Sequence, residues 1–153
     1  MKLVATHSHR FGREAVLAAG VLEEVESALH APNLVLALNT GKEAKALILK
    51  RLFEAGWAPN PQVSANFTLD VNAMKSGICL TTQTGNIARA FYDLMKFEVL
   101  HKSGRADAAI LIVPSKAAAQ IIASNIAQFE RIRDELELFR HVVTIPLLLL
   151  AFE

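Results

Sequence analysis

Asn72-Ala-Met-Lys-Ser-Gly-Ile-Cys-Leu-Thr-Thr-Gln-Thr-Gly-Asn86 is the stretch of the chain that says most about its fold. In its middle, Lys75-Ser-Gly77 is typical of a tight turn, because glycine adopts backbone conformations that other residues avoid. The turn separates two short extended segments, the second running from Ile78 to Thr84. Gly85-Asn86 then opens a helix. The stretch therefore predicts a hairpin that brings polar side chains to the junction between a strand and a helix.

Two helical patterns precede this hairpin. Ser8 is a good N-cap residue, and an approximate apolar face follows it, so we expect a helix as far as Ala28. Thr40-Gly-Lys-Glu43 matches a capping box, the side-chain pattern that opens many helices. Apolar residues at helical spacing continue from it to Ala55, which predicts a second helix there.

Extended patterns lie on both sides of the hairpin. Apolar and polar residues alternate from Val63 to Asn72, which predicts a strand because successive strand side chains point to opposite faces. The near-continuous apolar run from Ala106 to Val113 predicts a strand that is covered on both faces. A helix after Ser115 and a closing strand from Val142 to Phe152 complete the pattern. We therefore expect an α/β fold, a mixed β-sheet flanked by helices, in a single domain over residues 1–153.

The composition is that of a globular protein, since 52% of the 153 residues are hydrophobic and 20% are charged. Cys79 is the one cysteine, which excludes an intramolecular disulfide and a cysteine metal cluster. Neither a secretory signal nor an apolar run long enough to span a bilayer is visible. A cytoplasmic protein without a membrane partner is therefore expected. The net charge of +1 neither supports nor excludes nucleic acid as a partner.

Several segments together resemble the BglII-type type II restriction endonucleases of the PD-(D/E)xK nuclease superfamily. They are the stretch Asn72–Asn86, the helix that follows it as far as Lys96, and the strand that ends at Pro114. Ser8-His-Arg10 and Gly56-Trp57 are also similar to that group. The resemblance spans most of the chain, and Asn72–Asn86 is its distinctive part. It implies a restriction-endonuclease-like fold and a homodimer that encloses duplex DNA and hydrolyses one phosphodiester bond in each strand.

The resemblance also implies a catalytic motif. In that motif an Asp and a Glu on adjacent strands hold Mg²⁺, which activates a water molecule, and a Lys or Gln two residues after the Glu helps to position the water. Carried over to this chain, these positions hold Asn72, Thr81 and Gln83. Only Gln83 matches, because amide and hydroxyl oxygens supply no charge to offset the dehydration of a divalent ion. The motif is therefore degenerate, and impaired or lost hydrolysis is expected.

Asp70 is the carboxylate that could compensate for the loss. On a strand, residues 70 and 72 would share a face at a separation of about 7 Å. An active enzyme with a rearranged site would use Asp70 as its metal ligand, with Asn72, Thr81 and Gln83 as the other catalytic positions and Mg²⁺ as the cofactor. Asp93, two turns into the next helix, is expected to lie too far away to contribute.

Basic residues on two helices are candidates for contact with the DNA backbone. Arg89 and Lys96 lie on the helix that the resemblance places at the DNA cleft, and Lys42 and Lys45 lie on the polar side of an earlier helix. A solvated helix face is the other interpretation of these lysines.

Three hypotheses follow. The first is a duplex-DNA-binding relative of the BglII group with impaired or lost Mg²⁺-dependent hydrolysis. The second is an active endonuclease that uses Asp70. The third is a non-catalytic structural or protein-interaction domain whose polar strand face is ordinary surface.

Overall fold

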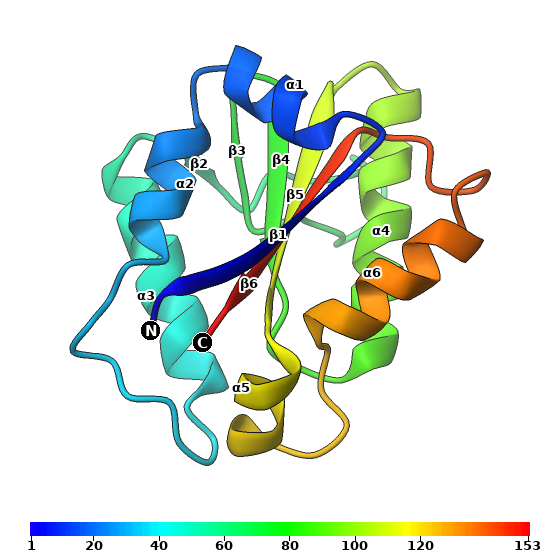
Figure 1. Ribbon diagram of the computed structural model, residues 1–153. Helices are drawn as coiled ribbons and strands as arrows, with labels where there is room; N and C mark the ends of the chain where they lie inside the picture. The colour runs from blue at the N-terminus through cyan, green and yellow to red at the C-terminus, as the bar shows by residue number, and fades with distance from the viewer.

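The computed structural model describes residues 1–153 and contains a six-stranded sheet with helices on both of its faces (Figure 1). Helices α1, α2 and α3 lie on one face, and α4 and α6 lie on the other. The elements are β1 (Leu3–His9), α1 (Gly12–Ala18), α2 (Leu22–Ala28), α3 (Gly41–Glu54), β2 (Ala58–Pro59), β3 (Ala73–Lys75), β4 (Ile78–Thr82), α4 (Ile87–Lys102), β5 (Ala108–Pro114), α5 (Lys116–Ile122), α6 (Phe129–Leu138) and β6 (Leu147–Phe152).

The strand order is β1-β6-β5-β4-β3-β2. Strands β4, β5 and β6 run parallel to one another, and all other pairings are antiparallel. The predicted mixed sheet flanked by helices is therefore confirmed. Because the three parallel strands end at the same edge of the sheet, the loops after β4 and β5 both lie there, and α4 and α5 both start from that edge (Figure 1).

The central strands separate two hydrophobic cores. Ile78 and Leu80 of β4 contact the core under α1, α2 and α3, whereas Cys79 faces the core under α4 and α6. Strand β5 is buried along its whole length, as the apolar run predicted. Burial raises the pKa of the Cys79 thiol to about 12, so this group stays protonated and unreactive in the folded protein.

The start of the chain differs from the expected helix between Ser8 and Ala28. Strand β1 extends to His9, whose buried ring lies 2.9 Å from the carbonyl oxygen of Val143. Two short helices then follow in place of one, because Gly20 adopts a left-handed conformation (φ 73°) between them. The pairing of β1 with β6 outweighs the local capping preference of Ser8.

The predicted strand from Val63 to Asn72 is wrong. The segment forms a loop whose only ladder contact is a single bridge between Gln62 and Asp70. The amide of Val63 donates to Leu69, so the loop folds back and satisfies part of its backbone locally. Val63 and Val71 are buried at its two ends. Ala65 and Phe67, between these ends, are exposed, so the alternating pattern corresponds neither to a strand nor to alternating burial.

The helices around the hairpin agree with the sequence in position and differ in capping. The predicted helix after Thr40 is present as α3, but the Thr40 hydroxyl bonds to the backbone of Ala37 and makes no capping contact. Asn86 does cap α4, because its Oδ1 accepts from the amide of Ala88 at 2.9 Å. None of the helices combines the length and apolar character that crossing a bilayer requires.

Candidate functional site

Gln83 lies directly after β4, at the edge where the parallel strands end. Its backbone amide donates to the carbonyl of Ile112 at 2.8 Å, which fixes it to the neighbouring strand β5. Its side-chain Nε2 donates to Asp93 Oδ2 at 2.7 Å, and its Oε1 accepts from the amide of Gly85 at 2.9 Å. Both ends of the amide are therefore occupied, and the side chain connects the end of β4 to α4.

Asp93 is the buried carboxylate of this site, with only 3% of its surface exposed. Its Oδ1 forms an ion pair with Lys96 Nζ at 2.7 Å, and the same ammonium donates to the backbone oxygen of Asp70 at 3.0 Å. The expectation that Asp93 lies too far from the hairpin is wrong. Helix α4 packs against β4, and the long side chain of Gln83 bridges the space between them. We name Gln83, Asp93 and Lys96 the acid–ammonium cluster.

One signal in the sequence could have identified Asp93. The buried face of α4 is otherwise formed largely by apolar residues, among them Ala90, Leu94 and Phe97, and Asp93 lies on the same face. A carboxylate on the apolar face of a helix requires a partner, because an unpaired buried charge is costly. The partner could not have been named without the fold.

Asn72 and Thr81 occupy the positions of the expected carboxylates. Asn72 is hydrogen-bonded to β4, and Thr81 is buried within β4. Asn72 Oδ1 accepts from the amide of Thr82 at 3.0 Å, and the amide of Asn72 donates to Leu80 at 3.0 Å. Thr81 is 2% exposed, and its hydroxyl has no hydrogen-bond partner. The adjacent hydroxyl of Thr82 is also unpartnered. Neither Asn72 nor Thr81 presents a free charged oxygen.

Asp70 lies at the rim of the site and is exposed. Its carboxylate makes no hydrogen bond or ion pair, and only its backbone oxygen contacts Lys96. Residues 70 to 72 lie outside the strands, so Asp70 and Asn72 do not share a strand face as predicted.

Of the basic candidates, Lys96 belongs to the acid–ammonium cluster and Lys45 lies near it. Lys45 reaches this region from α3 and is half-buried. Burial is the main reason that the pKa of Lys45 is lowered; the carboxylates of Asp93 and Asp70 raise it, and the charges of Lys96 and Arg89 lower it. These mutual effects place Lys45 in the same electrostatic environment as the residues of α4.

Lys42 lies on the first turn of α3, beside this region. It lines a cleft of about 290 Å³ together with Gly41 and Thr84. The backbone of Gly41 lies close to Thr84, since a Cβ atom at Gly41 would lie 3.2 Å from Cβ of Thr84. Lys42 and Lys45 therefore lie on the first turns of α3, Arg89 on the first turn of α4, and Lys96 just past the middle of α4.

The comparisons with known proteins agree with this fold. The sequence model of the family described as restriction endonuclease BglII/BglIII matches residues 4–152. The chain belongs to the BglII/BglIII family.

Two solved structures resemble the BglII/BglIII family fold of this chain. One is a crystal structure of restriction endonuclease BglII complexed with a DNA 16-mer, with a TM-score of 0.85 and 17% identity, covering 100% of this chain and 78% of that one. The other is a crystal structure of free BglII, with a TM-score of 0.73 and 16% identity; the match covers 100% of this chain and 80% of that one. At these identities the likeness shows the fold, and the predicted restriction-endonuclease-like architecture is confirmed. No curated protein matches the chain.

The magnesium ion implied by the motif of the BglII group does not fit the donors present. Magnesium prefers charged oxygens in an octahedral arrangement. Here the buried Asp93 is held by Lys96 and Gln83, and the amide oxygen of Asn72 is bonded to the backbone. No three His, Cys, Asp or Glu side chains lie together as a metal-binding group.

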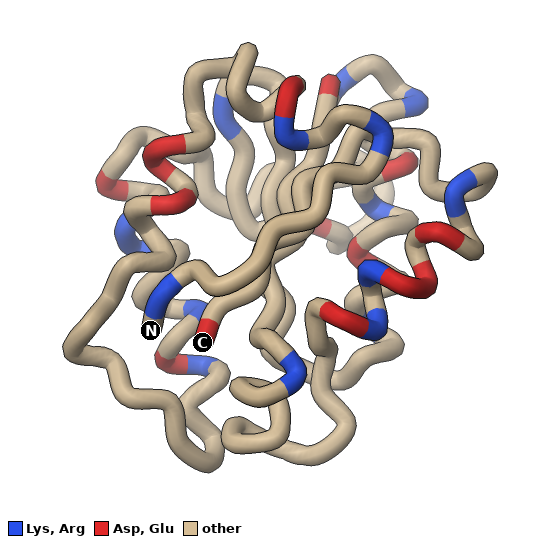
Figure 2. The backbone as a smooth tube through the Cα atoms, viewed as in Figure 1, with Lys and Arg blue, Asp and Glu red and all other residues tan.

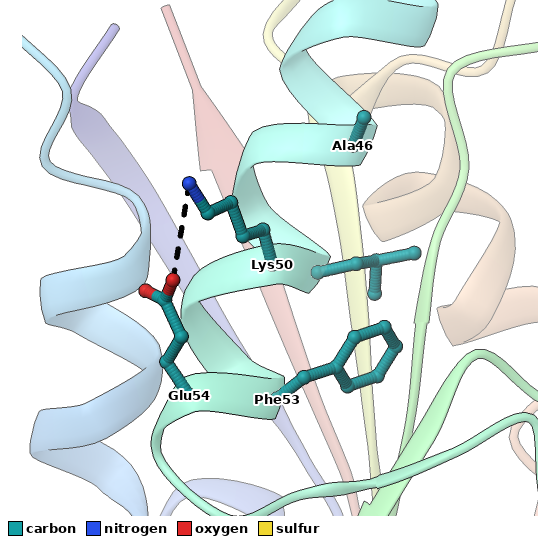
Figure 3. A pocket seen from close by; sticks show the side chains of 5 residues that line it. Ala46, Lys50, Phe53 and Glu54 are labelled. Atoms are coloured by element: carbon teal, nitrogen blue, oxygen red, sulfur yellow. Dashed lines mark ion pairs between the residues drawn. The ribbon is translucent and has the colours of Figure 1, made fainter.

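A surface depression of about 620 Å³ on the outer side of α3 lies apart from this site (Figure 3). It is lined by Ala46, Leu49, Lys50, Phe53 and Glu54. Its one charged feature is the pair of Lys50 with Glu54 at 3.8 Å, and both side chains are well exposed. An exposed pair of this kind contributes little, and no further polar groups converge on the depression.

Proposed function

We propose that this protein binds duplex DNA at the edge of the sheet that holds Gln83 and Asp93, and that its Mg²⁺-dependent phosphodiester hydrolysis is lost or impaired. The acid–ammonium cluster is the observation that carries the proposal. Where the motif needs two carboxylates and a metal ion, the chain has neutral Asn72 and Thr81, and its nearest buried carboxylate is paired with Lys96 at 2.7 Å. A paired carboxylate is a poor ligand for a hydrated cation.

The arrangement of charge supports DNA as the ligand. Basic and acidic residues are interspersed over the chain without a long block of one sign (Figure 2). Against this background, Lys42 and Lys45 lie on the first turns of α3, and Arg89 and Lys96 lie on α4. Ammonium and guanidinium groups supply most of the affinity for a phosphate backbone. The crystal structure of BglII with a DNA 16-mer is a relative in which this fold is complexed with DNA.

The former catalytic positions take structural roles in this proposal. Asn72 fastens the loop before β3 to β4, and Gln83 fastens β4 to α4. Thr81 fills space in the core, and Asp70 remains at the exposed rim. The alternative of an active endonuclease requires Asp70 to bind a metal ion without a second free carboxylate beside it.

The proposed assembly is a homodimer, each subunit a single domain of residues 1–153, acting in the cytoplasm. An exposed apolar row on α4 supports the dimer: Tyr92 is 51% exposed, Met95 43% and Val99 50%. These side chains lie at helical spacing, so they form one stripe on the outer side of the helix. Light scattering that gives twice the 16.7 kDa chain mass is the expected result, and replacement of Val99 by Asp should favour the monomer.

Electrophoretic mobility shifts on a mixed-sequence duplex, repeated at increasing salt, test DNA binding. With four phosphate contacts, the logarithm of the binding constant should fall against the logarithm of salt concentration with a slope of about −3 to −4. Arg89→Ala should reduce the slope by about 1, whereas Lys50→Ala, a basic residue of α3 outside the site, should leave it unchanged. Absence of a shift at low salt would favour the structural or protein-interaction alternative.

Hydrolysis is tested separately by incubating duplex DNA with excess protein and Mg²⁺ or Mn²⁺. Intact DNA is expected. Cleavage that requires the metal and disappears in Asp70→Ala would instead establish the rearranged active site.

A further inference from the structure

The acid–ammonium cluster satisfies its carboxylate entirely with side chains of this chain. Lys96 binds Asp93 Oδ1 and Gln83 binds Oδ2, so both oxygens are occupied. The two charged side chains are 15% and 4% exposed. The ammonium is held further by the backbone oxygen of Asp70 at 3.0 Å and lies 5.3 Å from the centre of the Tyr92 ring. Lys96 is therefore a paired and largely buried cation and not a fully solvated surface lysine.

The charges around this cation explain why its position matters for a phosphate ligand. Lys96 neutralises the Asp93 carboxylate at 2.7 Å in a place where both side chains are largely buried. Without Lys96 the charge of Asp93 would be unpaired and would repel a phosphate group from a position where water screens poorly.

We infer that the Lys96 ammonium replaces a divalent ion as the group that neutralises this site, so that the protein binds the DNA backbone without Mg²⁺ or any other divalent cation. The inference rests on the proposed function and specifies that DNA binding does not require a divalent ion. An ammonium that belongs to the chain is not removed by a chelator. It also occupies the carboxylate oxygen that a metal ion would need.

The first test measures DNA affinity in EDTA and then in Mg²⁺ or Ca²⁺ at matched ionic strength. The two affinities should agree within about twofold, because the phosphate contacts are the same in both conditions. A divalent ion that strengthens binding by about tenfold or more overturns the inference and leaves DNA binding itself intact. If no DNA is bound in either condition, the proposed function is overturned instead.

The second test uses Lys96→Met, which removes the ammonium and keeps much of the side-chain volume. Its affinity in EDTA should fall by about tenfold or more, and a divalent cation should recover part of the loss. Lys96→Arg should retain binding in EDTA because it retains the charge. Lys50→Met is the matched control and should bind like the unmodified protein. Equal affinities of Lys96→Met and the unmodified protein in EDTA would overturn the inference.

A third variant keeps the test decisive if Lys96→Met folds poorly, which circular dichroism would reveal. Asp93→Asn combined with Lys96→Met removes both charges of the pair and restores local neutrality. This double variant should bind DNA in EDTA more tightly than Lys96→Met alone and show no response to Mg²⁺. Binding that depends on Mg²⁺ in the double variant would overturn the inference. Titration of Mn²⁺ alone into the unmodified protein should give no binding heat. Saturable binding of Mn²⁺ would also overturn the inference.

Discussion

Helix α4 carries two buried carboxylates, and they are held in different ways. Glu98, 9% exposed, accepts from the backbone amides of Thr144 and Ile145 and from the Thr144 hydroxyl, with Lys102 at 4.0 Å. Asp93, 3% exposed, is held only by the side chains of Lys96 and Gln83. Both carboxylates are satisfied, and only one lies in the candidate site.

The difference lies in what each partner can do. The backbone amides of Thr144 and Ile145, just before β6, cannot leave Glu98 unless the entry to that strand is disturbed, so this carboxylate is a structural clamp. Side chains can rotate toward a ligand, so the charges of the acid–ammonium cluster can respond to a phosphate group. Burial of a charge therefore does not identify a functional residue, whereas the mobility of its partners helps to do so.

Glu98→Ala should have the largest effect on stability. It leaves two backbone amides and a hydroxyl without their acceptor, so the free energy of unfolding should fall by about 3 kcal/mol. Urea denaturation measures the loss. Glu98→Gln keeps one acceptor oxygen and should lose clearly less. A loss of under about 1 kcal/mol in Glu98→Ala would remove the distinction between the two carboxylates.

Asp93→Asn should cost less, about 1–2 kcal/mol, because Lys96 can turn toward solvent and the amide can still accept one hydrogen bond. Its DNA affinity at low salt should rise a few-fold, since a negative charge near the phosphate is removed. The same denaturation and mobility-shift assays measure both effects. Destabilisation equal to that of Glu98→Ala would show that Asp93 is also a structural clamp.

Thr81→Val should have a smaller effect of the opposite sign. The hydroxyl is buried without a partner, and an apolar group of similar shape avoids that cost, so a gain of about 0.5–1 kcal/mol is expected. Thr82→Val is a matched comparison on the other face of the strand. DNA affinity should not change in either variant. Loss of affinity in Thr81→Val alone would return a functional role to this position of the motif.

The smallest expected effect is a dependence on pH through Lys45. Its pKa in the folded protein is lowered from 10.5, chiefly by burial, so it loses its proton at a lower pH than an ordinary lysine. DNA affinity should therefore decline as pH rises through this lowered pKa. Stability should increase in the same range, because the folded state disfavours the charged form. Lys45→Arg stays charged and should show no such decline in affinity measured from neutral to alkaline pH.

The parts of the fold that depend on local patterns could be predicted from the sequence. The turn at Lys75-Ser-Gly77, the Asn86 cap and the buried strand β5 are set by neighbouring residues. The loop between Val63 and Val71 could not be predicted, because an alternating pattern does not show whether a partner strand is available. The break at Gly20 could not be predicted either, because a glycine within a helical pattern does not by itself reveal a positive φ.

The candidate site also has a part that local patterns predict and a part that depends on the fold. The motif located Asn72, Thr81 and Gln83, and the basic residues of α3 and α4 were recognisable by their charge. The contact between Asp93 and Gln83 could not be predicted, because it depends on how α4 packs against the sheet, which sequence spacing does not reveal.

The clamp at Glu98 also has a mechanical meaning. Helix α4 has 16 residues and is about 24 Å long, a length over which a helix behaves as a stiff rod. Asn86 holds its first turn beside the site, and Glu98 ties its second half to Thr144 and Ile145, just before β6. A force on Lys96 from a bound phosphate would therefore be transmitted along α4 to the contacts of Glu98 with Thr144 and Ile145.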